Sequence, residues 1–394
     1  MTIALVCPDG LSILLFCKGI IGALRRIPGA RVIVVSDIGE HGRDIEALGV
    51  TCIDVPMARF LDPRRDFQYL WRLTRTFRRE RCDLVFNFST KANIYGAIAA
   101  HLARVPRVVS HVVGMGGAFL PADTAGGKLL QALVLRLYDV AFRLTDKVWF
   151  TNRSDLAFFT GKGLVGPDKS VLTRNYLDVS AYAGDSIAPD EIAEARRELH
   201  LGPHDRVVIM VARMAWAKGV REFAEAAEQL KDRYPEALFL LVAPLETGSR
   251  DAVPESYIRK MEGAARLRWL GFRSDVKRLY AMANLAVLPS YYKEGGYPRA
   301  LLEPMAMGKP IIAADTEDCR GPVEEGRNGY LVPPRDSHAL AEAVARLLDD
   351  RARCDAFGRY GRFKAERDFD ERRIVVDALV ALGVLPALAA VPAS

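Results

Sequence analysis

Short apolar runs rich in β-branched residues alternate with longer helical stretches in the first half of the chain. The runs cover residues 3–7, 31–36, 84–88, 107–113 and 147–150. They do not alternate strictly between apolar and polar residues, which is typical of parallel strands covered on both faces. This pattern predicts a doubly wound parallel sheet of the α/β class.

The rhythm breaks after Asp178, and a polar helical stretch of mixed charge then ends at Gly202-Pro203. A second series of strand-like runs follows, at residues 207–211, 238–242, 268–270, 285–288 and 310–313. We therefore predict two Rossmann-like domains, over residues 1–185 and 186–370. A last helical stretch and tail, residues 371–394, would be free to pack back on the first domain.

Length and composition fit this division, since 394 residues are long for one domain and comfortable for two. The six cysteines form no CxxC pair and no Cys/His cluster, so we expect reduced thiols and no metal site. We find no signal peptide and no apolar stretch of the roughly 18–20 residues that span a bilayer. We expect a cytoplasmic protein.

The net charge of +6 is unevenly distributed. Residues 1–180 hold 24 Lys and Arg against 16 Asp and Glu, whereas the remainder is close to neutral. A basic first half indicates an anionic partner, and nucleic acid, acidic lipid and a diphosphate-bearing substrate all fit. A basic surface that only keeps the protein soluble is the plainer interpretation.

Two cations flank the loop that follows the strand at residues 207–211. Arg213 lies at its start, and Lys218-Gly219 lies where the next helix begins. Arg binds a phosphate through two nitrogens, Lys adds a point charge, and a helix N-terminus adds backbone N–H donors. The arrangement suits a diphosphate, although two solvated charges would give the same spacing.

A glycine-containing loop follows the strand at residues 285–288. Gly295-Gly296 permits a close approach of backbone to a ligand, and Pro298 suits the first turn of a helix. Glu303 then falls inside that helix, where its carboxylate can accept two hydroxyl hydrogen bonds of the kind a ribose offers.

Together these blocks resemble glycosyltransferase family 4, which has Arg-x4-Lys-Gly, a block like residues 294–310 and a run like residues 319–332. Residues 91–96 and Gly114-Met115-Gly116 are similar to segments of the bacterial members that extend glycans on undecaprenyl diphosphate. The resemblance implies the GT-B fold, two Rossmann-like domains facing a central cleft. It also implies a retaining, metal-independent enzyme without a cofactor, which moves a sugar from a nucleotide-sugar, preferably a UDP-sugar, to a lipid-linked or polysaccharide-precursor acceptor.

The resemblance also implies roles for particular residues. Arg213 and Lys218 would hold the donor diphosphate and stabilise the leaving nucleotide, and Glu303 would bind the ribose. Glu294 would contact the donor sugar, with the backbone of 295–297 (Gly295, Gly296 and Tyr297) near sugar and phosphates. The family places seven residues between its two Glu, whereas eight lie between Glu294 and Glu303. A bulged loop would restore Glu294 to the site.

Two residues of the first domain are candidates on the same grounds. His111 ends the strand-like run at residues 107–113, where related enzymes often have a His near the donor sugar. Lys91 opens a helix and is the candidate contact for an acceptor phosphate. A packed histidine at a strand end and a solvated lysine are the alternatives.

The helical stretch at residues 66–81 combines a basic face with an apolar stripe, and residues 129–144 form a second apolar helix. A basic amphipathic helix with Trp and Phe can lie on an anionic lipid surface, here the inner face of the cell membrane. The same stripe also suits core packing with a solvated face. Its members are Phe67, Leu70, Trp71, Thr74 and Phe77, beside Arg72, Arg75, Arg78, Arg79 and Arg81.

Three other functions compete. A nucleotide-sugar epimerase on a GT-B scaffold would share the donor site and need no acceptor. An NAD-dependent oxidoreductase needs Gly-x-Gly-x-x-Gly after its first strand, and residues 6–10 do not supply it. A non-catalytic protein that binds sugar or nucleotide fits the basic half, but no nucleic-acid-binding motif is present, so we expect no nucleic-acid partner.

Overall fold

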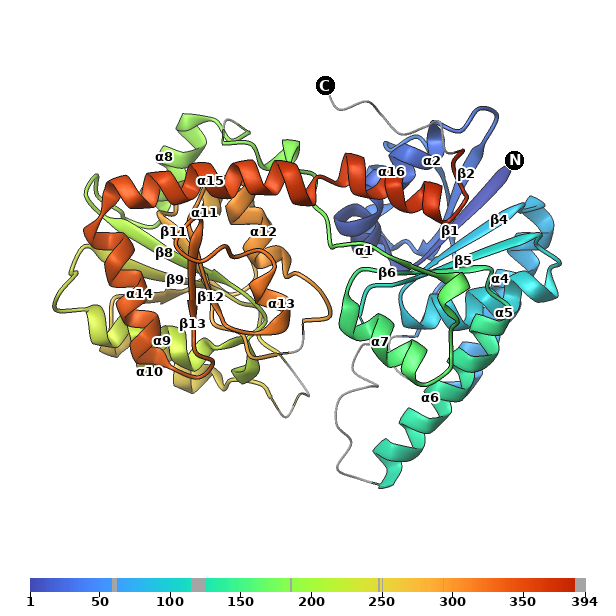
Figure 1. The fold of residues 1–394 in the computed structure, drawn as a ribbon, viewed down its shortest axis with the longest axis horizontal. Helices are drawn as coiled ribbons and strands as arrows, with labels where there is room; N and C mark the ends of the chain where they lie inside the picture. Colours follow the sequence, from blue (N-terminus) through green and yellow to red (C-terminus); the bar gives the residue numbers. More distant parts are fainter. Residues whose placement is uncertain are drawn as a thin grey trace. The chain divides into compact units, whose positions relative to one another are not determined.

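The computed structural model describes residues 1–58, 62–114, 125–184, 186–246, 249, 251–292 and 294–386. The chain divides into two compact units, residues 1–175 with the segment from Glu371 onward, and residues 176–370 (Figure 1). The first boundary falls before Tyr176 rather than at residue 185. Leu177 and Val179 are buried in the core of the second unit, and Leu177 N–H donates to Phe369 O.

The first unit is built on a seven-stranded parallel sheet with the strand order β3-β2-β1-β4-β5-β6-β7. The sequence pattern missed the edge strands β3 and β7, which are short and incompletely buried. The strands are β1 (Thr2–Asp9), β2 (Arg31–Asp37), β3 (Thr51–Asp54), β4 (Leu84–Phe88), β5 (Arg107–Val112), β6 (Lys147–Phe150) and β7 (Ser170–Leu172).

Helices cover both faces of this sheet. On one face, α4 and α6 pack against α5 and η3, and on the other α16 packs against α2 (Figure 1). The helices are α1 (Gly10–Ser12), η1 (Ile13–Cys17), α2 (Lys18–Arg25), η2 (Gly39–His41), α3 (Gly42–Glu46), α4 (Pro63–Glu80), η3 (Ala92–Gly96), α5 (Ala97–Leu102), α6 (Ala125–Arg143), α7 (Arg153–Gly161), η5 (Pro167–Lys169) and α16 (Glu371–Ala381).

The long helix α4 shows how the local sequence determines where a helix begins and which of its faces is buried. Asp62 caps its N-terminus by accepting a hydrogen bond from Arg65 N–H at 3.1 Å, and Pro63 occupies the first turn. Tyr69, Leu73 and Phe77 recur every four residues and are buried, so one stripe of the helix packs on the sheet. The arginines occupy the opposite, exposed face.

The second unit contains a six-stranded parallel sheet with the order β10-β9-β8-β11-β12-β13, and its two faces carry separate apolar cores. Its strands are β8 (Arg206–Val211), β9 (Ala237–Val242), β10 (Leu267–Trp269), β11 (Leu285–Leu288), β12 (Ile311–Ala314) and β13 (Gly329–Val332). Its helices are η6 (Ser180–Tyr182), α8 (Pro189–Glu198), η7 (Trp216–Lys218), α9 (Val220–Leu230), α10 (Glu255–Ala264), α11 (Val276–Met282), α12 (Arg299–Ala306), α13 (Glu317–Arg320), α14 (Ser337–Asp349) and α15 (Arg351–Phe369).

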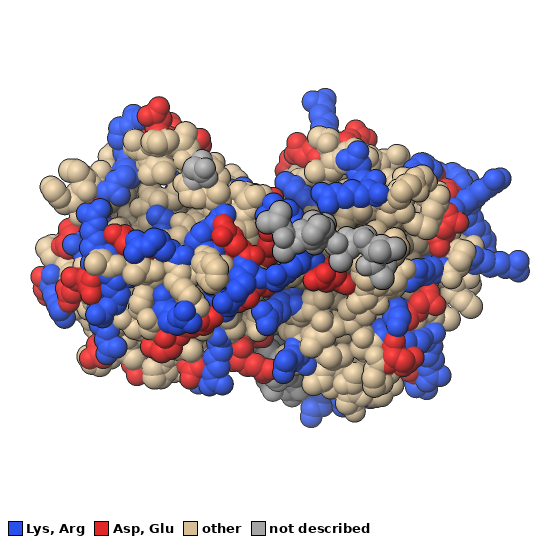
Figure 2. All heavy atoms as spheres, turned by 45° about the horizontal axis from the view of Figure 1, so that its top comes forward, with Lys and Arg blue, Asp and Glu red and all other residues tan. Residues whose placement is uncertain are grey.

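Both units are doubly wound, so the predicted α/β class with two Rossmann-like sheets is confirmed. The strand order reverses between β1 and β4 in the first sheet and between β8 and β11 in the second. Ligands of such sheets bind outside the carboxyl ends of the strands at this reversal. Among the described helices, none combines the length and apolarity needed to cross a bilayer. Basic side chains project from the right-hand edge of the first unit in Figure 2.

Candidate active site

Two loops of the second unit meet at the reversal between β8 and β11. The loop after β8 carries Arg213 and passes through η7 to Gly219, which has a positive φ of 82°. A Cβ at Gly219 would lie 2.4 Å from Pro289 O, so only glycine lets this loop lie against the end of β11. Lys218 is thereby placed beside the β11 loop, with only 8% of its surface exposed.

Hydrogen bonds to a single carbonyl join these loops. Ala217 O accepts the backbone N–H of Tyr291 and of Tyr292, each at 2.9 Å, and the Ser290 hydroxyl at 3.3 Å. The positions of the residues after β11 therefore depend on the loop after β8.

The two cations of the predicted diphosphate clamp are each paired with a carboxylate. Lys218 Nζ donates to Glu294 Oε2 at 2.5 Å, and Arg213 Nη1 donates to both oxygens of Glu246 at 2.7 and 2.8 Å. The Tyr292 ring holds both cations near its face, 4.5 Å from Lys218 Nζ and 5.2 Å from Arg213 Cζ. The structure thus brings Arg213, Lys218 and Glu294 to one cluster.

The extra residue between Glu294 and Glu303 is accommodated by a bulge. Gly295 and Gly296 have positive φ angles of 72° and 123°, and their N–H groups donate to Asp318, each at 3.2 Å. Glu294 stays beside Lys218 despite the irregular spacing. Burial raises the pKa of the Asp318 carboxyl, and the backbone hydrogen bonds oppose that shift.

Tyr297 completes this loop and packs against an apolar core of the second unit. Its ring meets the edge of Phe369 with 5.7 Å between centroids, and a Cβ at Gly321 would lie 2.1 Å from it. The glycine at position 321 therefore leaves room for the tyrosine.

Glu303 lies on α12, with 13% of its side chain exposed. Its Oε1 accepts Arg299 Nε at 2.9 Å and the Tyr182 hydroxyl at 3.0 Å. Burial and the charge of Glu303 raise the pKa of the Tyr182 phenol, so this group stays a proton donor. The arrangement fixes one oxygen of Glu303 and keeps its carboxylate in place.

The residues of this site that sequence reasoning missed include Tyr182, Glu246, Arg299 and Asp318. Arg299 was detectable, because it lies four residues before Glu303 on a helix, the spacing of an ion pair. The other three reach the site from distant parts of the chain, and no local pattern marks them.

The two candidates of the first unit are both held inside it. Lys91 Nζ donates to Asp66 Oδ1 at 2.5 Å, and the Tyr95 hydroxyl donates to the other oxygen of Asp66 at 3.2 Å. Burial and the nearby Asp66 raise the pKa of Tyr95 to about 12. A phosphate that met Lys91 would have to share this lysine with Asp66.

His111 is 1% exposed, and its ring stacks on Trp149 with 3.8 Å between centroids. Neither ring nitrogen has a hydrogen-bond partner within the described part of the chain. Burial lowers the pKa of His111 to about 3, so the ring is neutral. The turn after it was predicted at Gly114-Met115-Gly116, and its last two residues lie outside the described residues.

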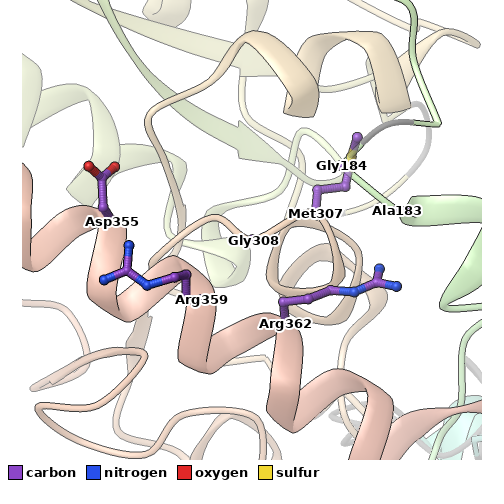
Figure 3. Close-up of a pocket in the computed structure, with 7 residues that line it drawn as sticks. All are labelled: Ala183, Gly184, Met307, Gly308, Asp355, Arg359 and Arg362. Atoms are coloured by element: carbon purple, nitrogen blue, oxygen red, sulfur yellow. The ribbon is translucent and has the colours of Figure 1, made fainter.

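A separate hollow of about 600 Å³ lies in the second unit, beside the amino end of β12 (Figure 3). One of its two arginines, Arg362, donates hydrogen bonds to the carbonyls of Val179, Tyr182 and Ala306. The hollow is lined by Ala183, Gly184, Met307, Gly308, Asp355, Arg359 and Arg362. The described residues contain no group of His, Cys, Asp and Glu arranged to hold a metal ion.

The geometry at the β8–β11 reversal can bind an anion and a pair of hydroxyls. Lys218 and Arg213 supply positive charge, and the carboxylates of Glu294 and Glu303 can accept hydroxyl hydrogen bonds. A nucleotide diphosphate that carries a sugar has these groups.

Two family models match the chain, "Glycosyl transferases group 1" over residues 191–364 and "Glycosyl transferase 4-like domain" over residues 18–175. The chain belongs to this family of glycosyltransferases, and the resemblance seen in the sequence is confirmed. Its reaction is the transfer of a sugar.

Characterised relatives and solved structures agree with this assignment. The chain is 28% identical over 352 residues to the N,N'-diacetylbacillosaminyl-diphospho-undecaprenol alpha-1,3-N-acetylgalactosaminyltransferase of Campylobacter jejuni, covering 89% of this chain and 90% of that enzyme. It is 28% identical over 289 residues, 73% of this chain and 72% of the relative, to the UDP-Gal:alpha-D-GlcNAc-diphosphoundecaprenol alpha-1,3-galactosyltransferase of Escherichia coli. Anabaena HepE, solved in complex with UDP-glucose, matches with a TM-score of 0.78 at 22% identity over 98% of this chain and 100% of HepE. This last match shows the fold, the predicted GT-B class.

The buried state of His111 predicts that its ring stays neutral in the folded protein. The free ring takes up a proton near pH 6.5, whereas the folded one does so near pH 3. The unfolded state therefore binds more protons below pH 6.5, so this residue lowers the free energy of unfolding as pH falls, by about 1.4 kcal/mol per pH unit. Histidine NMR from pH 8 to 5 should show no titration of His111. A His111 midpoint near 6.5 would contradict the assignment.

Proposed function

We propose that the protein transfers a sugar, with retention of configuration, from a UDP-sugar to a glycan held on undecaprenyl diphosphate. The observation that carries the proposal is the cluster of Lys218, Arg213 and Glu294 at the β8–β11 reversal of the second unit. The names of the two relatives, from Campylobacter jejuni and Escherichia coli, support the undecaprenyl-linked acceptor. The UDP complex of HepE and the UDP-Gal in the second relative's name support uridine as the base.

In this proposal the donor diphosphate takes over cations that carboxylates now hold. Arg213 and Lys218 exchange part of their contact with Glu246 and Glu294 for phosphate oxygens. Glu294, freed from a full ion pair, accepts hydroxyls of the donor sugar, and the backbone of Gly295, Gly296 and Tyr297 lies near the sugar. Glu303 binds the ribose.

The chemistry then needs stabilisation of a leaving group more than acid–base catalysis. The bond from the anomeric carbon to the diphosphate oxygen breaks as an acceptor hydroxyl bonds to the same face of the sugar. Lys218 and Arg213 offset the charge that develops on the diphosphate, and the N-terminus of α9 adds its dipole. The departing phosphate takes the proton of the hydroxyl.

The acceptor side of the proposal rests on the basic first unit. Lys91, beside Asp66, is the proposed contact for the acceptor diphosphate. Peripheral membrane contact is proposed through α4 and α6, because Phe67 and Trp71 on α4 are 69% and 54% exposed and Leu129 on α6 is 73% exposed. The exposed face of α4 also carries Arg64, Arg65, Arg72, Arg75, Arg78 and Arg79, and no exposed acid. Such a surface suits the anionic inner face of a cell membrane.

The donor site predicts nucleotide binding that depends on Glu303. Calorimetry should show that the wild type binds UDP more tightly than GDP. The Glu303→Ala substitution should lower the affinity for UDP by about tenfold or more, because a charged hydrogen-bond acceptor is lost. Glu317→Ala, which removes an exposed acid of α13, is the matched control. If UDP does not bind the folded wild type, the donor site is wrong.

The two cations predict a loss of turnover. Arg213→Ala and Lys218→Ala should each lower kcat/KM by a factor that corresponds to a loss of about 3 kcal/mol of transition-state stabilisation. This magnitude is that of a lost oxyanion donor. Arg221→Ala, an exposed neighbour on α9, should retain activity. The assay measures transfer from UDP-sugars to a synthetic undecaprenyl-diphosphate-linked sugar. Near-normal transfer by both variants would rule out the clamp, and donor conversion without an acceptor would favour an epimerase.

The membrane surface predicts binding to anionic vesicles. The double variant Phe67→Ser/Trp71→Ser should bind phosphatidylglycerol vesicles about tenfold more weakly than the wild type, since two apolar side chains no longer enter the interface. Phe363→Ser removes a comparably exposed ring, 52% exposed, from the second unit and should leave binding unchanged. Equal flotation of the wild type and the double variant would show that α4 does not meet the membrane.

A further inference from the structure

One carboxylate binds the backbone of the bulged loop after β11. Asp318, on α13, accepts the N–H of Glu294 at 2.9 Å, and those of Gly295 and Gly296 at 3.2 Å each. It is 8% exposed, and its neighbour Cys319 is fully buried. Three successive N–H groups converging on one anion form a concave backbone site of the kind that binds anions in many proteins.

This contact stabilises a loop conformation that the chain would not otherwise favour. Both glycines have φ angles in the region that L-residues avoid. Without an acceptor, the three N–H groups would be left unpaired in a largely buried place, which costs free energy. A charged acceptor makes stronger hydrogen bonds than a neutral one, so the carboxylate suits this position better than an amide would.

The loop conformation in turn sets the position of Glu294. Its N–H is the first of the three bound by Asp318, and its side chain reaches Lys218 at 2.5 Å and the Ser290 hydroxyl at 2.6 Å. Eight residues separate Glu294 from Glu303, so a loop without the bulge would shift one of them. The glycine pair takes up the additional residue, and Asp318 is the side chain that holds the pair.

We infer that Asp318 is a positioning residue for sugar transfer, which acts by keeping Glu294 against Lys218. The inference rests on the proposed role of Glu294 toward the donor sugar. It differs from two other roles that the same contacts allow. In the first, Asp318 stabilises the second unit without affecting Glu294. In the second, Asp318 occupies the place of a phosphate, and the donor displaces it from the loop N–H groups.

A double-mutant cycle with Glu294 separates these roles. The variants are Asp318→Asn, Glu294→Gln and the pair, with Asp315→Asn as the matched control. Asp315 lies close in the chain, but its carboxylate is exposed and paired with Arg320. The donor is whichever of UDP-glucose, UDP-galactose and their 2-acetamido counterparts supports transfer, and UDP alone is titrated by calorimetry.

Asp318→Asn should lower kcat about tenfold to a hundredfold, while the affinity for UDP stays within about twofold of the wild type. Removing a residue that orients a metal ligand in other enzymes has an effect of this size. In the Glu294→Gln background the same change should have little further effect, because both substitutions disrupt one contact. Asp315→Asn should have no effect in either background. Where Asp318→Asn melts at a much lower temperature than the wild type, Asp318→Ser, which keeps an acceptor, is measured instead.

Four results would overturn the inference, and a fifth would overturn the proposed function with it. Full activity of Asp318→Asn would show that the loop holds without it, and additive losses with Glu294→Gln would show a structural role. Tighter UDP binding by Asp318→Asn would show that the carboxylate competes with phosphate. Normal turnover of Glu294→Gln would refute the proposed role of Glu294 toward the donor sugar and the inference with it. No turnover by the wild type with any of the four donors would refute the proposed function itself.

Discussion

The ion pair between Lys218 and Glu294 depends on nearly every local feature of the second unit's site. Lys218 reaches it because Gly219 lets the β8 loop lie against Pro289, and Glu294 reaches it because Asp318 holds the glycine pair. Both side chains are about nine-tenths buried. A buried pair recovers little net free energy after desolvation, so its retention favours a functional role over a stabilising one.

Carboxylate partners balance the charge of the two cations at this site. Two cations beside one ring would repel each other, and the largely buried Lys218 would be costly to leave unpaired. Glu246 and Glu294 neutralise them, and the face of Tyr292 lies near both. In the proposed function the donor diphosphate exchanges with these carboxylates, and part of its binding free energy offsets the loss of the original pairs.

The sequence predicted the two sheets well, because buried parallel strands such as β4 and β9 are continuous apolar runs. It missed β3, β7 and β13, which are strands of only three or four residues at the edges of the sheets. Arg213, Lys218 and Glu303 were candidates because of their places after strand ends and because of the family resemblance. Asp318 and Tyr182 were not, because they act through contacts across 22 residues or more. His111 was ambiguous in sequence, and only its burial beside Trp149 shows the environment that keeps it neutral.

Lys218, Arg213 and Glu303 are proposed to form a site for a nucleotide diphosphate. A crystal structure of the protein with bound UDP is the decisive experiment. We expect phosphate oxygens within hydrogen-bond distance of Lys218 Nζ and Arg213, with the ribose hydroxyls on the Glu303 carboxylate. UDP bound elsewhere, or bound with Lys218 and Arg213 still paired only to Glu294 and Glu246, would contradict this proposal.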